Sequence, residues 1–431
     1  MSEKLKKSCA VLVAALMAAS MWSWVQHIAI PHQVSESEAK GIPRGNLSDL
    51  YPRWLGTREL LSHGRDPYGS DVTREIQAGY YGRAIDAARP NDPKDQQAFA
   101  YPLYIVFVLA PTIGLPFPVV QKIFLVLLVL LTAASVPLWL RALGWRITAA
   151  WQLVWILLVT GCFPAIQGFK LQQLTLLVAA LVAASLYCIV RRRLALAGAL
   201  LALSGIKPQL VVLIIAALCI WVVGNWKERQ RLLWSFAGVM TILVLGAEFL
   251  LPGWIGEFRL AVAAYYQYTG GGQSVMNLSL TPLWGKVASV VLVSALFVSL
   301  WKVRRAAADT AAFRWAFSLV LATTLLVVPM YAPYNQLLLV PGLLWIAQGI
   351  QPLWNRNFLS RFLITLTALV VLWPWLAAGA LAVALVFLPG HVVEKAWPMP
   401  LYTSLAIPVM TVATLAAGRS LVSKESPFPP R

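Results

Sequence analysis

The sequence predicts an all-α polytopic membrane protein. Of its 431 residues, 59% are hydrophobic and only 12% are charged, whereas a soluble domain carries about 25% charged residues. Apolar runs close to the length that crosses a bilayer as a helix recur along the whole chain. These runs lack the strict period of two that is typical of β-barrel strands. We therefore expect a single transmembrane domain over residues 1–431, without a large soluble part.

Twelve apolar runs are expected to be spans. The N-terminus, MSEKLKK, has a basic head, and the long apolar stretch after it has no clear small-residue cleavage site, so a retained first span with a cytoplasmic N-terminus is expected. The expected spans lie near 9–30, 119–140, 147–165, 171–190, 194–206, 210–224, 232–252, 285–301, 313–330, 336–350, 360–388 and 400–417.

Basic loops set the orientation of these spans. Arg191–Arg193 and Lys227–Arg231 lie in short loops that the positive-inside rule assigns to the cytoplasm. The formal net charge of +18 is explained in the same way, with anionic membrane lipids as the partners and no nucleic acid. The Pro-rich piece 99–118 is expected to be re-entrant or broken, because proline removes backbone hydrogen bonds. If it crossed fully, Arg191–Arg193 would lie outside.

Two loops then face the extracytoplasmic side, residues 31–98 and 253–284. The first loop holds ten of the 17 acidic residues, so acid–base chemistry is expected there. Asp49 opens its stretch GNLSDLYPRWLGTRELLSHGRDPY. A short helix is expected after it, with Pro52 in the first turn and Gly64 as the stop. Being apolar on one side, it could lie flat at the membrane interface, and Asp49 could alternatively be its N-cap.

Polar side chains also recur at the outer ends of the expected spans. Charged groups at membrane depth usually face a cavity or a partner, although lysines can also extend to the interface and Glu248 could be a structural partner of a lysine. All of these groups fall on the side of Asp49, and a carboxylate facing a basic, amide-rich pocket suits a substrate with a lipid phosphate. They are Lys170, Gln172, Gln173, Lys207, Gln209, Glu248, Tyr334, Asn335 and Gln336.

Several ordered motifs resemble glycosyltransferase family 87 of the GT-C superfamily, whose members use polyprenol-phosphate-mannose-type donors. In that family an Asp after the first span is followed by an aromatic residue and by a helix that ends in a Gly-x-Asp-Pro-Tyr turn. The similar positions here are Asp49, Tyr51, Gly64, Asp66, Pro67 and Tyr68, then Tyr101–Leu103, the segment GFKLQQLTLLVAAL and Lys207–Gln209. The late segment Ala332–Asn335 is also similar, but it contains no acid or His. The resemblance runs from about residue 45 to 345.

The resemblance implies a GT-C-type bundle of about twelve transmembrane helices with interfacial helices in the first outer loop. It implies transfer of a hexose such as mannose, with inversion, from a polyprenyl-phosphate donor to a lipid or glycan acceptor at the outer face of a bacterial cytoplasmic membrane. Asp49 would be the general base, and Lys207, then Lys170, would bind the donor phosphate. No cofactor and no metal are expected. The other candidate contacts are Tyr51, Arg53, Tyr68, Gln172, Gln209, Glu248, Tyr334 and Asn335.

A membrane transporter or lipid flippase is the main alternative. Its key polar residues should lie near the midplane, on broken helices and often in repeated halves. A non-catalytic membrane scaffold is a further alternative, and it would not need Asp49 to face Lys207.

Overall fold

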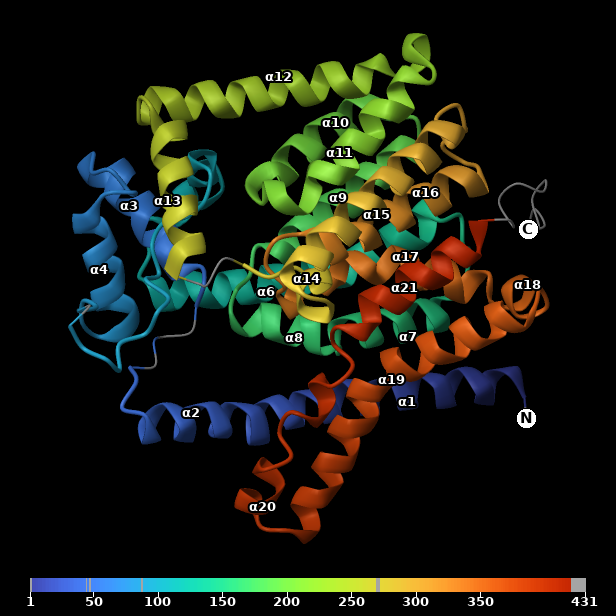
Figure 1. Cartoon of the computed structure of the whole chain (residues 1–431), viewed down its shortest axis with the longest axis horizontal. Coiled ribbons are helices and arrows are strands. Elements are labelled where there is room, and N and C mark those ends of the chain that lie inside the picture. The colour runs from blue at the N-terminus through green and yellow to red at the C-terminus, as the bar shows by residue number, and fades with distance from the viewer. Residues whose placement is uncertain (1, 44, 46–47, 87, 269–271, 420–431) are drawn as a thin grey trace.

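The computed structural model describes residues 2–43, 45, 48–86, 88–268 and 272–419, and within these ranges it is helical without strands (Figure 1). The chain is an integral membrane protein: six helices are long and apolar enough to cross a membrane, or seven if the bent pair α7–α8 is one span. Five shorter apolar helices of 10–17 residues accompany them. At 1.5 Å per residue these are about 15–25 Å long, less than the bilayer core of about 30 Å. The expected count of about twelve full spans is therefore confirmed only in part.

The first helical run is longer than expected. α1 (Glu3–Trp24) continues through the π-helical η1 (Val25–Ala29) into α2 (Ile30–Ala39). The expected outer loop was to begin at residue 31. Pro31 does not end the helix, because it lies in the first turn of α2, where its missing N–H is tolerated.

The first loop folds into two packed helices, α3 (Tyr51–His63) and α4 (Ser70–Tyr81). Both end signals of α3 are confirmed: Pro52 lies in the first turn, and Gly64 adopts the left-handed conformation at φ +66°. Much of α3 is buried against the rest of the protein, and its placement at the membrane interface stays a prediction. Trp54, Leu55 and Leu60 are all buried, and the helix packs against α4 and the 103–112 segment.

The Pro-rich segment is short and broken, as predicted. It consists of η2 (Leu103–Ile105), α5 (Val106–Leu109) and η3 (Ala110–Thr112). Ten helical residues reach only about 15 Å, half of the bilayer core. The segment packs against α3 at one side and α12 at the other, and so it joins the loop to the bundle.

The central bundle begins with α6 (Phe117–Ala142). The straight span expected at 147–165 is instead a pair, α7 (Ala149–Thr160) and α8 (Phe163–Lys170), bent by 59°. The bend falls between Gly161 and Pro164, where Pro164 lies in the first turn of α8. The bundle continues with α9 (Thr175–Val190), α10 (Leu194–Leu203), η4 (Ser204–Ile206), α11 (Pro208–Val223) and α12 (Trp226–Leu250).

The second outer loop contains α13 (Trp254–Tyr268) and α14 (Val275–Ser279). In Figure 1, α13 descends from the end of α12 on the same side as α3 and α4. The remaining elements are α15 (Pro282–Val303), α16 (Ala311–Val327), η5 (Pro333–Leu339), α17 (Val340–Gln348), α18 (Ile350–Trp354), α19 (Phe358–Phe387), α20 (Gly390–Glu394), η6 (Met399–Leu401) and α21 (Ala406–Ala417).

The hairpin of α9 and α10 separates two chemically different ends. α9 begins two residues after Gln173 and ends at Arg191–Arg193, about 24 Å away along its 16 residues. α10 returns to Lys207, and α11 leads away again toward Lys227–Arg231. The amide-rich and the basic loops therefore lie at opposite ends of these helices, as the predicted alternation requires.

Candidate active site

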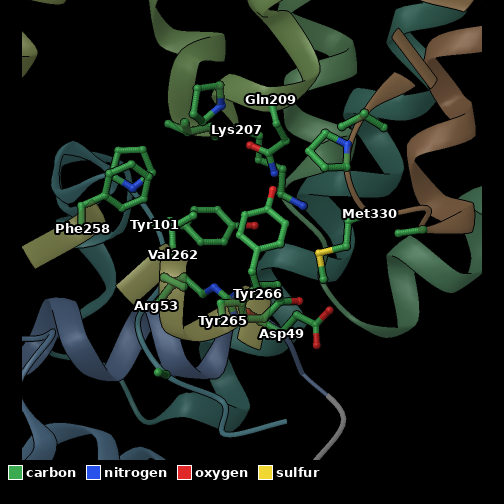
Figure 2. Close-up of a pocket in the computed structure, with 18 of the residues that line it drawn as sticks. Asp49, Arg53, Tyr101, Lys207, Gln209, Phe258, Val262, Tyr265, Tyr266 and Met330 are labelled. Carbon is green, nitrogen blue, oxygen red and sulfur yellow. The ribbon is translucent and has the colours of Figure 1, made fainter. Parts of the chain in front are cut away.

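A cavity of about 720 Å³ lies at the end of the bundle that carries Lys207 (Figure 2). Its walls come from the start of α3 with Asp49, from residues 95–102, from Gln173 and residues 206–209, and from α13. Residues from the segment 328–335 complete the lining. Six of the predicted site residues line it: Asp49, Arg53, Lys207, Gln209, Tyr334 and Asn335.

Asp49 is held at the cavity by its main chain. Its N–H donates to the carbonyl of Leu171 at 2.9 Å, and its carbonyl accepts from Arg53 Nη1 at 2.7 Å. The N-cap residue of α3 is Leu50, without a side-chain cap, so the alternative that Asp49 caps this helix is wrong. The Asp49 carboxylate Oδ2 instead accepts from Gln173 Nε2.

The surroundings make the Asp49 carboxyl more basic than usual. Desolvation raises the pKa of Asp49 above its ordinary value, whereas Arg53, the hydrogen bond from Gln173 and the charge of Lys207 act in the opposite direction. Desolvation prevails. A carboxylate with a raised pKa is a better proton acceptor at neutral pH than an exposed one.

Lys207 is a buried cation rather than a lysine that extends to the interface. Lys207 lies between η4 and Pro208, and the residue is only 5% exposed. Nζ donates to Gln173 Oε1 at 2.5 Å and to Thr175 Oγ1 at 2.8 Å. The ring centroids of Tyr334 and Tyr101 lie 5.1 and 5.7 Å from Nζ, within the range of cation–π attraction. An ammonium has three donors, so one N–H remains for a ligand.

A buried polar network joins the carboxylate to the cation. Gln173, which is 4% exposed, donates to Asp49 through its amide nitrogen and accepts from Lys207 through its amide oxygen. Thr175 accepts from Lys207 and donates to Asn335 Oδ1 at 3.0 Å. Fully paired polar networks in a low-dielectric interior are rigid. Asp49 and Lys207 are therefore fixed at the two ends of one side-chain amide.

Further aromatic and charged groups complete the lining. Figure 2 shows Tyr265 and Tyr266 of α13 on the same side of the cavity as Arg53 and Asp49. The Arg53 guanidinium lies over the ring of Tyr101, 4.5 Å from its centroid. Asp95 supplies a second carboxylate, which accepts from the backbone N–H of Gln97 at 3.0 Å and from its side chain at 2.9 Å.

Two predicted contacts support the cavity from behind instead of lining it. Tyr68 packs edge-on against Phe99, and its hydroxyl donates to the carbonyl of Tyr101 at 2.7 Å. Tyr51 packs edge-on against Phe117. Neither tyrosine is among the described residues of the cavity wall.

Three further candidates also lie outside the described lining. Gln172 turns away and accepts from Ser48 Oγ at 2.7 Å and Gln121 Nε2 at 3.2 Å. Glu248 accepts the N–H of Gly253 at 2.7 Å after the end of α12. Lys170 is the last residue of α8.

Sequence reasoning gave no specific role to several residues of the site. Gln173 was noted only as one polar residue at a span end, and Tyr101 only as part of a similar segment. Thr175, which pairs with Lys207, was not singled out. Asp95 was one acid among ten in the loop. The one available signal for α13 was the cluster AAYYQY in the second outer loop, which is aromatic and amphipathic.

Comparison with known proteins gives one match. The family model of glycosyltransferase family 87 matches residues 99–329, more than half of the chain. This range includes Tyr101, Gln173 and Lys207, whereas Asp49 precedes it. No curated protein and no solved structure matches.

Proposed function

The chain belongs to glycosyltransferase family 87 and is a membrane glycosyltransferase, and from this premise we propose that it transfers a hexose such as mannose from a polyprenyl-phosphate donor to a hydroxyl of a lipid or glycan acceptor. The observation that carries the proposal is the bridge Asp49–Gln173–Lys207. It joins the proposed proton acceptor to a buried cation through one side-chain amide. The cavity of about 720 Å³ leaves room for a reacting sugar.

The reaction is a single displacement with inversion. Asp49 takes the proton of the acceptor hydroxyl as the hydroxyl oxygen attacks the anomeric carbon. The bond from that carbon to the phosphate oxygen breaks, and the electron pair leaves with the polyprenyl phosphate. Lys207 stabilises the charge that gathers on this phosphate, using its remaining N–H. The proton on Asp49 is then lost to solvent.

The hydrogen bonds from Lys207 through Thr175 suggest a role for Asn335, in the late segment Ala332–Asn335. Members of the family carry an acid or His in that segment, whereas this chain has Asn335. Asn335 accepts from Thr175, which in turn accepts from Lys207. We assign Asn335 to orienting the lysine, with Tyr334 and Gln209 at the donor side of the cavity.

An apolar groove supports a lipid-linked substrate. A groove of about 320 Å³ between α7, α8, α17 and α19 is lined almost entirely by aliphatic and aromatic side chains. Gln336 lines it, and the preceding residue, Asn335, lines the polar cavity. A polar head and an isoprenoid chain would thus find matching surfaces on two sides of η5.

The proposed membrane side of the active site rests on the position of the basic loops. The cavity lies at the end opposite Arg191–Arg193, and basic loops favour the cytoplasm. We therefore propose an active site at the extracytoplasmic face of a bacterial cytoplasmic membrane. Nucleotide sugars are cytoplasmic, so a lipid-linked donor is required there. The transporter or flippase alternative fits less well, because the polar groups gather at helix ends rather than at a midplane site.

One experiment tests this function. Purified protein is incubated with radiolabelled polyprenyl-phosphate hexoses, one sugar at a time, and with a membrane lipid extract. We expect label in a new product whose glycosidic linkage has the opposite anomeric configuration to the donor. Transfer from nucleotide sugars alone would overturn the choice of donor. Movement of the donor across vesicle membranes without any product would favour the flippase.

A further inference from the structure

A second cavity lies at the other end of the molecule and has no place in the proposed reaction. Its volume is about 570 Å³, and it is formed by the end of α15, the start of α19 and the end of α21. In Figure 1 this is the side where α18, the start of α1 and the end of α21 lie. Arg229 donates to the carbonyl of Arg304 at 2.8 Å, which ties this end to the basic loop at Lys227–Arg231.

The cavity is strongly cationic. Lys302, Arg356 and Arg419 line it, and no carboxylate is among its described lining residues. Lys302 and Arg419 make no hydrogen bond or ion pair with the part of the chain that the structure describes. Arg356 donates to the carbonyl of Ala417 through Nη1, which leaves most of its five N–H donors available. Three positively charged side chains thus line one cavity, without a carboxylate among the described residues that line it.

A helix terminus adds directed donors. α19 is 30 residues long and begins at Phe358, so its first turn carries partial positive charge and orphan N–H groups. The Asn357 side chain accepts only from the N–H of Ser360, at 2.8 Å, and its main-chain carbonyl accepts from the N–H of Arg361 at 3.2 Å. Helix N-termini of this kind bind phosphate readily.

A buried hydroxyl lines the same cavity without a partner. Ser360 is 2% exposed, and its Oγ has no hydrogen-bond partner among the described residues. Buried polar groups are nearly always paired, because an unmade hydrogen bond costs stability. An anion in the cavity would accept from this hydroxyl and from the cations around it.

The flanks of the cavity are apolar and exposed. Phe358 is 82% and Leu359 59% exposed. Trp301, which precedes the lining residue Lys302, and Trp354, in α18, are also exposed. Aromatic side chains of this kind lie at membrane interfaces. A phosphate that carries acyl chains would contact both surfaces, whereas inorganic phosphate would use only the cations.

From these observations we propose that the cavity between α15, α19 and α21 binds the phosphate of an anionic phospholipid in the leaflet at this end of the protein. The site is independent of sugar transfer. It fixes the ends of three helices through one headgroup, and so anionic lipid stabilises the fold.

The test compares lipid binding by matched variants. The full-length protein is placed in zwitterionic nanodiscs that contain a small fraction of phosphatidylglycerol, and retained phosphatidylglycerol is counted by native mass spectrometry. Arg356→Gln and Lys302→Gln should each lower binding roughly five-fold, as expected for loss of one cation near a charged headgroup. Ser360→Ala leaves the charge unchanged and should still weaken binding several-fold. The control, Arg191→Gln, removes an exposed cation from the α9–α10 turn at the same end and should have no effect.

Each other outcome overturns the proposal. If Arg191→Gln weakens binding as much as Arg356→Gln, the lipid responds only to the general positive field of this end. If Ser360→Ala binds normally, the cavity is not the site. If inorganic phosphate displaces phosphatidylglycerol and raises Tm equally in purely zwitterionic nanodiscs, the ligand is free phosphate. Variants are compared only where elution and Tm without anionic lipid match the parent protein.

Discussion

Replacing Asp49 with Asn should separate proton transfer from every other role of this residue. The main-chain bonds to Leu171 and from Arg53 are unaffected by the change. The Asn oxygen can still accept from Gln173, so the bridge to Lys207 persists. Only the ability to accept the acceptor's proton is lost. Loss of a general base costs roughly 10²–10⁴ in rate, which is about 2.7–5.4 kcal/mol in the barrier.

The assay is steady-state transfer of labelled hexose from polyprenyl phosphate, with donor affinity measured separately. We expect kcat to fall by this factor while donor binding is unchanged or slightly tighter, because one negative charge near the phosphate is removed. Asp95→Asn is the matched control, since it makes the same chemical change in the same cavity. If Asp49→Asn retains more than a tenth of kcat and Asp95→Asn does not, Asp95 is the base and the proposed mechanism is wrong.

Lys207→Ala should weaken donor binding, measured by donor titration, roughly 10- to 100-fold, because one charge-assisted hydrogen bond is lost. It should also lower kcat in the transfer assay. If Lys170→Ala has an equal effect, the assignment of the donor phosphate to Lys207 is wrong. Gln173→Leu removes the amide between Asp49 and Lys207, so both kcat and donor affinity should fall, and a normal enzyme would show that the bridge is dispensable. Because desolvation raises the pKa of Asp49 above 3.8 and the base must be ionised, kcat/KM should decline as pH falls, with a midpoint above 3.8. The residual activity of Asp49→Asn should lack this acid limb in a pH–rate profile.

The positions of the helices along the chain could be predicted from the sequence, because the membrane constrains which residues spans and loops contain. Spans must be apolar, and connecting loops carry the charge, so nearly every expected span from 119 onward coincides with a helix or a helix pair. Local end signals were equally reliable: Gly64 stops α3 because only glycine readily adopts its left-handed backbone. The number of full crossings was less predictable, since apolar helices enclosed by other helices can be short.

The fold of the outer loops could not be predicted in the same way. Their residues are polar and follow no membrane rule, so nothing in the sequence indicates that α13 lies across the cavity from Lys207. The same reason explains why Tyr51 and Tyr68 were expected to contact substrate. Both are aromatic residues in a motif that resembles the family's pattern, yet they pack against Phe117 and Phe99 and lie outside the described lining.

The two adjacent glutamines, Gln172 and Gln173, show what the sequence cannot decide about the site. Gln172 and Gln173 are chemically identical, and the sequence alone cannot say which one faces the substrate. The backbone decides, because Gln172 adopts the left-handed conformation at φ +47°, which is uncommon for a residue with a side chain. This turn sends the Gln172 amide to Ser48 and Gln121 and the Gln173 amide to Asp49 and Lys207. One glutamine thereby anchors the loop to α6, and the other joins the proposed base, Asp49, to Lys207. The strained residue lies immediately before the proposed catalytic bridge, where backbone strain is commonly found.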